Sequence, residues 1–354
     1  MVRYLVVVHW CPQPERSGRQ GKRLLLIGHL DTVFERNSPF QHFAREGQTA
    51  TGPGVEDMKG GDVALLYALK ALHSVGALEE TGVIVALTGD EEDPGDPVDV
   101  ARRELIEVAR RSDVALGFEG GVGMSTRYAT LARRGSSGWT LRATGIRGHS
   151  SQIFKEGFGS GAIFEAARIL NAFHEEMRGE EYLTFNPGVV LGGTFVEFDK
   201  ANGEGTAFGK TNVIAQTVTV NGGVRFITNE QEGRARAKMR AIVAEHLPGT
   251  TAEITFDDGY PAMPPTDGNR ALLDVLDRVS RDLGFGAVEA VDPGRRGAAD
   301  ISFVASLIDG IDGLGVIGDG GHTPEEMVDL EAMSVVLKRA ALLIYRLTRN
   351  TSGV

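Results

Sequence analysis

KRLLLIGHLDTV, residues 22–33, is the stretch that decides the fold class of this chain. Its apolar run predicts a buried strand over Lys22–Ile27, and GHLDTV follows at the C-terminal end of that strand. Working outward, apolar residues at helical spacing predict a helix over Asp62–Val75, and another apolar run predicts a strand over Gly82–Thr88. Strands that alternate with helices are typical of a parallel sheet covered by helices. We therefore expect an α/β fold with a mixed, mainly parallel sheet.

The same alternation continues on both sides of a central region. The elements expected there are a helix over Asp99–Arg111, a strand over Asp113–Phe118, a helix over Arg270–Leu283, a helical stretch over Asp300–Leu307, a strand over Leu314–Ile317 and a final helix over Glu331–Leu347. The first ten residues, MVRYLVVVHW, contain a short apolar run without a small-residue cleavage site, so we expect a strand there rather than a secretory signal. A linker rich in Pro, Gly and Arg separates this run from Lys22.

The pattern changes in the central region. The elements expected there are a strand over Trp139–Ala143, a helix over Gly159–Glu176, strands over Gly188–Gly192 and Asn212–Phe226, a helix over Glu230–His246 and a strand over Ala252–Phe256. The order β-α-β-β-α-β predicts an inserted α+β, ferredoxin-like domain over residues 136–257. A discontinuous first domain then comprises residues 1–135 and 258–354. The long strand Asn212–Phe226 is expected to offer an exposed edge for dimerisation.

Composition excludes several classes of protein. The 354 residues are enough for two domains, and a formal charge of -11 without a cluster of Lys and Arg argues against a nucleic-acid partner. No apolar stretch reaches about 18 residues, so no membrane-spanning helix is expected. The single cysteine, Cys11, excludes an internal disulfide and a cysteine-type structural zinc site. Any metal ligands must therefore be histidines and carboxylates.

Five segments place a metal-capable side chain just beyond an apolar strand or in a glycine-rich loop. They are GHLD (28–31), GPGVEDMKGG (52–61), GDEED (89–93), GFEGG (117–121) and GDGGH (318–322). In an open α/β sheet, the loops beyond the carboxyl ends of the strands converge on one crevice, so these segments can share a site. Two histidines and three carboxylates satisfy two zinc ions when one carboxylate bridges them.

Two pairs within these segments suggest a division of roles. His29 and Asp31 point the same way on an extended segment, so Asp31 can accept a hydrogen bond from the imidazole and raise its basicity toward a metal. Glu91 and Glu92 repel each other unless one binds a metal and the other serves as a base for the attacking water. Each residue alone also fits a structural histidine, a helix cap or a solvated acidic turn, so the case rests on the whole set.

Taken in order, the five motifs resemble the co-catalytic zinc peptidases, which include glutamate carboxypeptidase, aminoacylase, acetylornithine deacetylase and succinyl-diaminopimelate desuccinylase. The resemblance runs from about Lys22 to the C-terminus, and it implies a zinc exopeptidase-like fold with two zinc ions per subunit. Such sites also accept Co²⁺ or Mn²⁺. The resemblance implies that Asp57 bridges the two zinc ions, that His29 and Glu119 complete one site, and that Glu92 and His322 complete the other. It also implies that Glu91 is the general base and that Asp31 orients its histidine.

Within this family the sequence looks most like the glutamate carboxypeptidases. Glu119 favours that branch, as does the pair of Asn212 and Arg225, which the resemblance implies help to hold the carboxylate of the substrate. His149, in GHSS, matches a lid histidine that reaches into the site of the partner subunit. The resemblance thus implies a homodimer formed through the inserted domain, and a peptide or N-acyl amino acid substrate with a free carboxylate beside the scissile bond.

Two other functions stay open at this point. One is a deacylase for a single N-acylated metabolite, and the other is an inactive relative that captures peptides, against which Glu91 and the complete ligand set argue. Relatives normally carry several tens of residues before the first strand, so we expect a shortened N-terminus or a misassigned start. The compartment is then cytoplasmic for the chain as given, and periplasmic or secreted if a signal has been lost.

Overall fold

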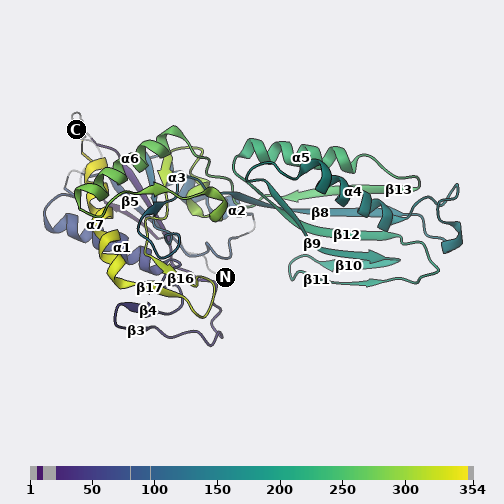
Figure 1. Ribbon diagram of the computed structural model, residues 1–354, viewed down its shortest axis with the longest axis horizontal. Coiled ribbons are helices and arrows are strands. Elements are labelled where there is room, and N and C mark those ends of the chain that lie inside the picture. The colour runs from purple at the N-terminus through teal and green to yellow at the C-terminus, as the bar shows by residue number, and fades with distance from the viewer. Residues whose placement is uncertain (1–5, 11–20, 80, 96, 350–354) are drawn as a thin grey trace. The chain divides into compact units, whose positions relative to one another are not determined.

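The computed structural model describes residues 6–10, 21–79, 81–95 and 97–349, which divide into two compact units. One unit comprises the described residues up to Arg133 and from Ala262 onward, and the other runs from Arg134 to Pro261. The inserted domain that we expect over residues 136–257 lies within the second unit. Cys11 and the linker expected before Lys22 lie outside the described residues. Figure 1 labels the elements of both units.

The first unit is built on a five-stranded sheet in the order β1-β5-β2-β6-β15. Its strands are β1 (Val6–Trp10), β2 (Leu24–His29), β5 (Val83–Thr88), β6 (Val114–Gly117) and β15 (Asp309–Ile311). β1 runs antiparallel to β5, and the other neighbours are parallel. The prediction of a mixed, mainly parallel sheet is therefore confirmed. Because β2 is central, its carboxyl end is flanked by those of β5 and β6.

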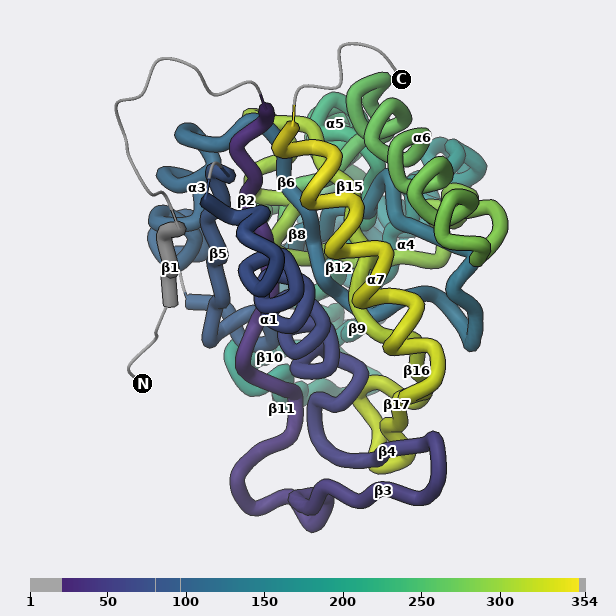
Figure 2. The backbone as a smooth tube through the Cα atoms, turned by 90° about the vertical axis from the view of Figure 1, so that its left-hand side faces the viewer, coloured from purple at the N-terminus to yellow at the C-terminus, as the bar shows by residue number. Residues whose placement is uncertain are grey.

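Helices cover both faces of this sheet. They are α1 (Lys59–Ser74), α2 (Val98–Ala101), α3 (Arg103–Ala109), α6 (Asp267–Asp282) and α7 (Leu330–Leu347). Figure 2 shows α1 and α7 running side by side, and the two helices are in contact. Among the described helices, none is both long and apolar enough to cross a bilayer.

The four apolar residues of β2 explain why this strand is buried on both faces. Leu24 and Leu26 join one core, which α1, α6 and α7 complete. Leu25 and Ile27 point the opposite way and join a second core with α3 and the 3-10 turn η3 (Asp300–Phe303). All four side chains are nearly inaccessible to solvent. The strand is therefore held firmly from both sides, which fixes the position of His29 at its end.

Three expected elements of this unit differ in the structure. The helix expected over Asp99–Arg111 is broken at Arg102 into α2 and α3, because the side chain of Arg102 turns inward to pair with carboxylates. The helical stretch after Asp300 is only the turn η3. The prediction of a strand over Leu314–Ile317 is wrong, since the strand beside β6 in the sheet is β15. The apolar residues 314–317 are buried as a loop rather than as a strand.

A small sheet that we did not expect joins two distant parts of the chain. Its strands, in the order β16-β17-β4-β3, are β16 (Gly318–Asp319), β17 (Met327–Asp329), β4 (Thr49–Thr51) and β3 (Ala44–Glu46). β17 pairs antiparallel with β4. The loop that carries Asp57 and the loop that carries His322 therefore start from the same sheet. A further short pair consists of β7 (Tyr128–Ala129) and β14 (Glu289–Ala290), and a 3-10 turn η2 spans Pro293–Arg295.

The second unit is a four-stranded antiparallel sheet in the order β13-β8-β12-β9. Its elements are β8 (Gly135–Gly145), the turn η1 (Ser150–Gln152), α4 (Ala162–Met177), β9 (Thr184–Gly193), β12 (Thr217–Phe226), α5 (Asn229–Val243), β13 (Thr250–Asp257) and an unexpected hairpin of β10 (Phe195–Asp199) and β11 (Glu204–Phe208). Burial alternates along β8, so one face of the sheet is covered, and α4 and α5 pack against it. Chain order and strand order together give the ferredoxin-like arrangement that we predicted.

The strand Asn212–Phe226 does not provide the exposed edge that we expected. In the structure it is β12, which is hydrogen-bonded to β8 on one side and to β9 on the other. In this arrangement the first and third strands of the unit are central, so β9 and β13 are the outer strands of this sheet. The choice of β12 as the edge for dimerisation is therefore wrong.

Candidate metal centre

The first unit brings the expected metal ligands together at one edge of its sheet. His29 is the last residue of β2, Glu92 follows β5, and Glu119 follows β6. Asp57 lies in the glycine-rich loop before α1, and His322 follows β16. Parallel strands place their carboxyl ends side by side, which explains why residues far apart in sequence meet here.

The carboxylate of Asp57 lies between the two histidines. Its Oδ1 is 3.1 Å from Nε2 of His29, and its Oδ2 is 3.0 Å from Nε2 of His322. Each oxygen of one carboxylate therefore faces a different imidazole. His29 is buried, whereas the side chain of His322 is 56% exposed, so the centre opens to solvent on the His322 side.

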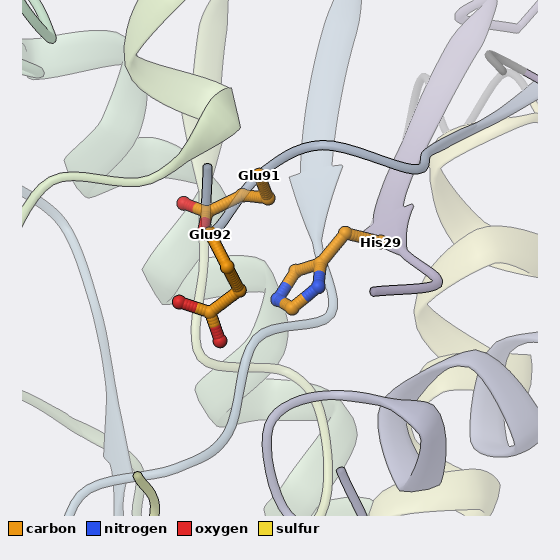
Figure 3. Close-up of side chains that lie close together, drawn as sticks. All are labelled: His29, Glu91 and Glu92. Atoms are coloured by element: carbon orange, nitrogen blue, oxygen red, sulfur yellow. The ribbon is translucent and has the colours of Figure 1, made fainter. Parts of the chain in front are cut away.

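Asp57 belongs to two groups of three possible ligands. One group is His29, Asp57 and Glu119, the other is Asp57, Glu92 and His322, and within each group the ligand atoms lie within 4.8 Å of one another. Glu119 Oε1 is 3.7 Å from Nε2 of His29, and Glu92 Oε2 is 3.4 Å from Nε2 of His322. His29 also forms a third group with Glu91 and Glu92, and Figure 3 shows its ring pointing toward the Glu92 side chain.

Crowding of carboxylates shapes the electrostatics of the centre. Burial raises the pKa of Glu91 to about 9, with help from the charge of Glu119. Burial, followed by the charge of Asp57, raises the pKa of Glu119 to about 8. Burial would also raise the pKa of Asp57, but hydrogen bonds with His29 and His322 lower it overall. A divalent cation would relieve this repulsion, and imidazole and carboxylate donors without a thiol suit zinc, cobalt or manganese. The residues therefore fit a metal pair.

Asp31 lies where the sequence places it, next to His29. Its Oδ1 is 3.3 Å from Nδ1 of His29, on the side of the ring away from Asp57. The same carboxylate accepts hydrogen bonds from the backbone N–H groups of Glu91 (3.2 Å) and Glu92 (2.9 Å). Asp31 therefore lies against His29 and accepts two backbone hydrogen bonds from the loop that carries the two glutamates.

A buried ion network that sequence reasoning missed supports the same loop. Arg102 is fully buried, and its Nε donates to Asp300 Oδ1 at 2.6 Å. Its Nη1 and Nη2 donate to the carboxylate and the backbone carbonyl of Asp90, both at 2.7 Å. The hydroxyl of Thr88 donates to the other oxygen of Asp300 at 2.5 Å. Thr88 and Asp90, at the two ends of the turn between β5 and Glu91, are therefore both fixed by hydrogen bonds with buried side chains.

Two further arginines that we missed lie beside Glu119. Arg133 is buried, its Nε donates to Asp312 Oδ2 at 2.5 Å, and its Nη2 is 4.0 Å from Glu119 Oε2. Burial, followed by the charge of Arg133, lowers the pKa of Arg296 to about 10. Within the described residues the buried Nε of Arg296 has no hydrogen-bond partner, although the charges of Glu119 and Glu56 act on it. The sequence signal that could have pointed to Arg296 is the pair of adjacent arginines in PGRRGAAD, residues 293–300.

The three predicted residues of the second unit fall into two places. Ser150 N–H donates to the carbonyl of Asn212 at 2.9 Å, which places His149 beside Asn212. Arg225 lies near the other end of β12, where it pairs with Ser136 and Thr184. Eight residues of strand separate Arg225 from the first residue of β12, a span of about 26 Å. Within one chain, Asn212 and Arg225 are therefore not brought together.

Comparisons with known proteins agree with this architecture. Residues 25–346 match the model of Peptidase family M20/M25/M40. Carboxypeptidase G2 from Pseudomonas sp. (strain RS-16) is 28% identical over 337 residues, which cover 93% of this chain and 74% of that protein. Succinyl-diaminopimelate desuccinylase from Psychrobacter sp. is 25% identical and covers 89% of this chain and 77% of its own length.

Solved structures share the fold. The aminopeptidase PepT from Bacillus cereus has a TM-score of 0.75 at 17% identity, and the alignment covers 98% of this chain and 85% of that one. The metallo-carboxypeptidase Sso-CP2 from Sulfolobus solfataricus has a TM-score of 0.60 at 15% identity, with 97% and 88% covered. The family match spans nearly the whole described chain, and relatives of this kind hydrolyse peptide or amide bonds in a metal-dependent reaction. This chain therefore belongs to Peptidase family M20/M25/M40 and is a metal-dependent hydrolase of peptide or amide bonds.

Proposed function

We propose that this hydrolase is of the carboxypeptidase type and uses two zinc ions to cleave the amide bond next to a free carboxylate. Peptides or N-acyl amino acids are the proposed substrates. The observation that carries the proposal is the position of Asp57, whose two oxygens face two different histidines. One carboxylate shared by two ligand groups suits a pair of cations, whereas a lone catalytic zinc takes three protein ligands in total.

The ligand groups divide between the two ions. Each ion would have three protein ligands, namely His29, Asp57 and Glu119 for one ion, and Asp57, Glu92 and His322 for the other. Ions bound there supply a Lewis acid and lower the pKa of water at the site. Glu91 lies outside these two groups, and its carboxylate groups with His29 and Glu92, which belong to different proposed sites. We assign to Glu91 the general base that takes a proton from the attacking water and returns it to the leaving nitrogen.

Arg296 is the group that we propose for recognition of the substrate carboxylate. It belongs to the first unit and lies close enough to Glu119 for their charges to interact. Arg133, the other nearby guanidinium, is already engaged by Asp312 and by the carbonyls of residues 297 and 298. Among the described residues, nothing hydrogen-bonds the Nε of Arg296, and a guanidinium beside a catalytic centre is suited to a planar, two-point contact with a carboxylate.

A pair of substrates tests this assignment. We expect Arg296→Ala to lower kcat/KM for a dipeptide with a free C-terminal carboxylate by roughly 10- to 150-fold, since a charge-assisted hydrogen bond is lost. The same dipeptide with a C-terminal amide should be cleaved slowly by both proteins, with little difference between them. Arg295→Ala, which removes an exposed neighbouring charge, is the matched control. If Arg296→Ala affected both substrates equally, the carboxylate would have to be bound elsewhere.

The broader proposal is tested by a panel of substrates and metals. We expect dipeptides and N-acyl amino acids to be hydrolysed when zinc, cobalt or manganese is added to metal-free protein. The similarity to carboxypeptidase G2 supports a carboxypeptidase, and the similarity to desuccinylases supports the second candidate, a deacylase for one N-acylated metabolite. The two candidates share the metal chemistry and differ in the pocket. Activity restricted to one N-acyl compound, with no dipeptide cleaved, would favour the deacylase.

We also propose a homodimer that forms through the second unit, now at the open edge of β9. Among the described strands, β12 is the ladder partner of β9, and the hairpin of β10 and β11 also contacts β9. Val190 of β9 is 54% exposed, and on α4 the side chains of Ile163 and Phe164 are 51% and 52% exposed. An open strand edge next to exposed apolar side chains favours self-association. We assign His149 a role in the partner's site, and Asn212 and Arg225 could hold one carboxylate only if they came from different chains.

A further inference from the structure

A buried carboxylate outside the expected ligand set holds the loop that carries Asp57. Glu326 is 1% exposed and follows His322 by four residues. Its Oε1 accepts hydrogen bonds from the backbone N–H groups of Glu56 at 2.8 Å and Asp57 at 3.0 Å. Its Oε2 accepts one from the N–H of Gly54 at 2.8 Å. Three backbone N–H groups of the loop thus converge on one side chain.

This loop lacks the restraints that a strand or helix would provide. Gly52 and Gly54 have positive φ angles of 152° and 79°, and glycine permits such conformations without fixing them. Backbone N–H groups removed from water require acceptors, and here a carboxylate provides the acceptor oxygens that a neighbouring strand would otherwise provide. Such charge-assisted bonds are stronger than bonds between neutral groups. Glu326 therefore fixes the backbone of this loop through hydrogen bonds, as secondary structure fixes the backbone elsewhere in the unit.

The charge of Glu326 also has a neighbour of opposite sign. A side-chain carbon added at Gly54 would collide with Nζ of Lys59, so the ammonium group lies directly against the loop. Lys59 is the first residue of α1, and its N–H donates to the carbonyl of Gly54 at 2.8 Å. The charges of Lys59 and Glu326 act on each other, and Glu326 accepts three hydrogen bonds from the loop, which together favour a buried carboxylate here.

We propose that Glu326 is a positioning residue for the cation pair, which locks the backbone of Asp57 so that its two oxygens face His29 and His322. This inference rests on the proposed function. Glu326 belongs to the segment of His322 and bonds the segment of Asp57, so it ties together the two loops that supply most of one ligand group. Because Asp57 is shared, both proposed cation sites depend on this arrangement, which we expect to form before a cation binds.

Zinc titration of metal-free protein, in competition with a chelator, tests the proposal. Glu326→Gln keeps the size of the side chain and one acceptor oxygen but presents N–H groups to the loop. We expect it to weaken zinc binding at both sites by about 10- to 100-fold, the range for lost partners of metal ligands. Wild-type affinity at both sites in Glu326→Gln would overturn the proposal. Absence of zinc binding by the wild type would instead refute the proposed function.

Glu165→Gln is the matched control for a merely structural role. Glu165 is fully buried and accepts hydrogen bonds from Leu247 N–H at 2.8 Å and Thr250 Oγ1 at 3.0 Å, but it lies in the second unit. Both variants should melt at lower temperature, and only Glu326→Gln should lose zinc affinity in its folded state. If the two variants bound zinc with equal affinity, Glu326 would have no positioning role.

Hydrogen exchange supplies a measurement that needs no variant, in case Glu326→Gln fails to fold. In the metal-free wild-type protein, the amides of Gly54, Glu56 and Asp57 should exchange slowly, as the neighbouring amides of α1 do. Protection without metal would show that the loop is held before zinc arrives. Exchange at the rate of an open loop until zinc is added would overturn the proposal.

Discussion

The carboxylate of Asp31 accepts a hydrogen bond from the backbone N–H of Glu92 at 2.9 Å, and its other oxygen lies 3.3 Å from Nδ1 of His29. One side chain therefore touches a proposed ligand of each ion. We expect Asp31→Ala to weaken zinc binding at both sites by about 10- to 100-fold, because both ligands lose their support. Titration calorimetry on metal-free protein measures this. A loss confined to one site would show that the link to the Glu92 loop is unimportant.

The purified protein should carry about two zinc equivalents per chain, and a chelator should abolish hydrolysis, since three carboxylates are too many for one catalytic zinc. Asp57→Ala should lower the occupancy of both sites because it removes the shared ligand. Elemental analysis alongside an activity assay measures both effects. Full activity in protein shown to be free of metal would end the hypothesis.

Glu91 and Glu92 should respond differently to the same substitution. Glu91→Gln should keep both metals and the fold while turnover falls by roughly two to four orders of magnitude, the range for a lost general base. Glu92→Gln should lose metal, since its carboxylate lies 3.4 Å from His322 in one ligand group. Metal content and kcat, measured on both variants, distinguish the roles. Equal metal content and equal rate loss would refute the division.

A mixed dimer tests whether His149 acts in the site of the partner. His149→Ala and Glu91→Gln should each be nearly inactive alone, whereas a dimer of one chain of each kind should contain one complete site. When equal amounts exchange freely, half of the dimers are mixed, so activity should return to about one quarter of the wild-type level. Kinetic assay after mixing, with a tag on one chain to verify exchange, measures the recovery.

The same experiment has two outcomes that would contradict the prediction. Verified mixing without recovery would place His149 in the site of its own chain or outside catalysis. A fully active monomer, established by light scattering at assay concentration, would refute both the role in the partner and the need for a dimer.

Glu165 should make the stability of the protein depend on pH. Burial raises the pKa of its carboxyl, but hydrogen bonds from Arg168, Leu247 N–H and Thr250 lower it overall below the ordinary value of 4.5. Its stabilising contribution is therefore present above pH 4.5 and is lost as the pH falls through the lower, folded pKa. Glu165→Gln should reduce the free energy of unfolding at pH 7 by roughly 2–4 kcal/mol.

Denaturant titrations of both proteins between neutral and acid pH check this prediction. The difference between wild type and Glu165→Gln should shrink as the pH drops, because the wild-type carboxyl becomes protonated. A difference that stays constant down to acid pH would show that the ionised form contributes nothing.

Much of the catalytic architecture was predictable because its signals are local. The run of leucines before His29 predicts a buried strand, and the glycine-rich motifs around Asp57 and Glu119 follow or precede such elements directly. The order of strands and helices in the inserted domain was also sufficient to predict the ferredoxin-like fold of that domain. The wrong choice of edge strand arose because element order along the chain does not say which strand pairs with which, and β12 pairs on both sides.

The residues that support the centre could not be predicted because their partners are distant in sequence. Arg102 lies 198 residues from Asp300, its partner, and reads in the sequence as part of one continuous helix. Glu326 lies 270 residues from Glu56, whose backbone N–H donates a hydrogen bond to its carboxylate. No periodicity or spacing connects such pairs, because only the folded sheet brings them together. Sequence patterns therefore indicate the ligands of this centre but not the groups that hold them.

The shared position of Asp57 has a consequence for the order in which the centre forms during synthesis. His29, Asp57 and Glu119 leave the ribosome early, but the segment with His322 and Glu326, which holds the Asp57 loop, comes after the whole inserted domain. The ~200 residues between Glu119 and His322 take roughly 10–40 s to translate. Throughout that interval the nascent chain lacks both His322 and the carboxylate that holds the Asp57 loop, so the proposed centre is completed only late in translation.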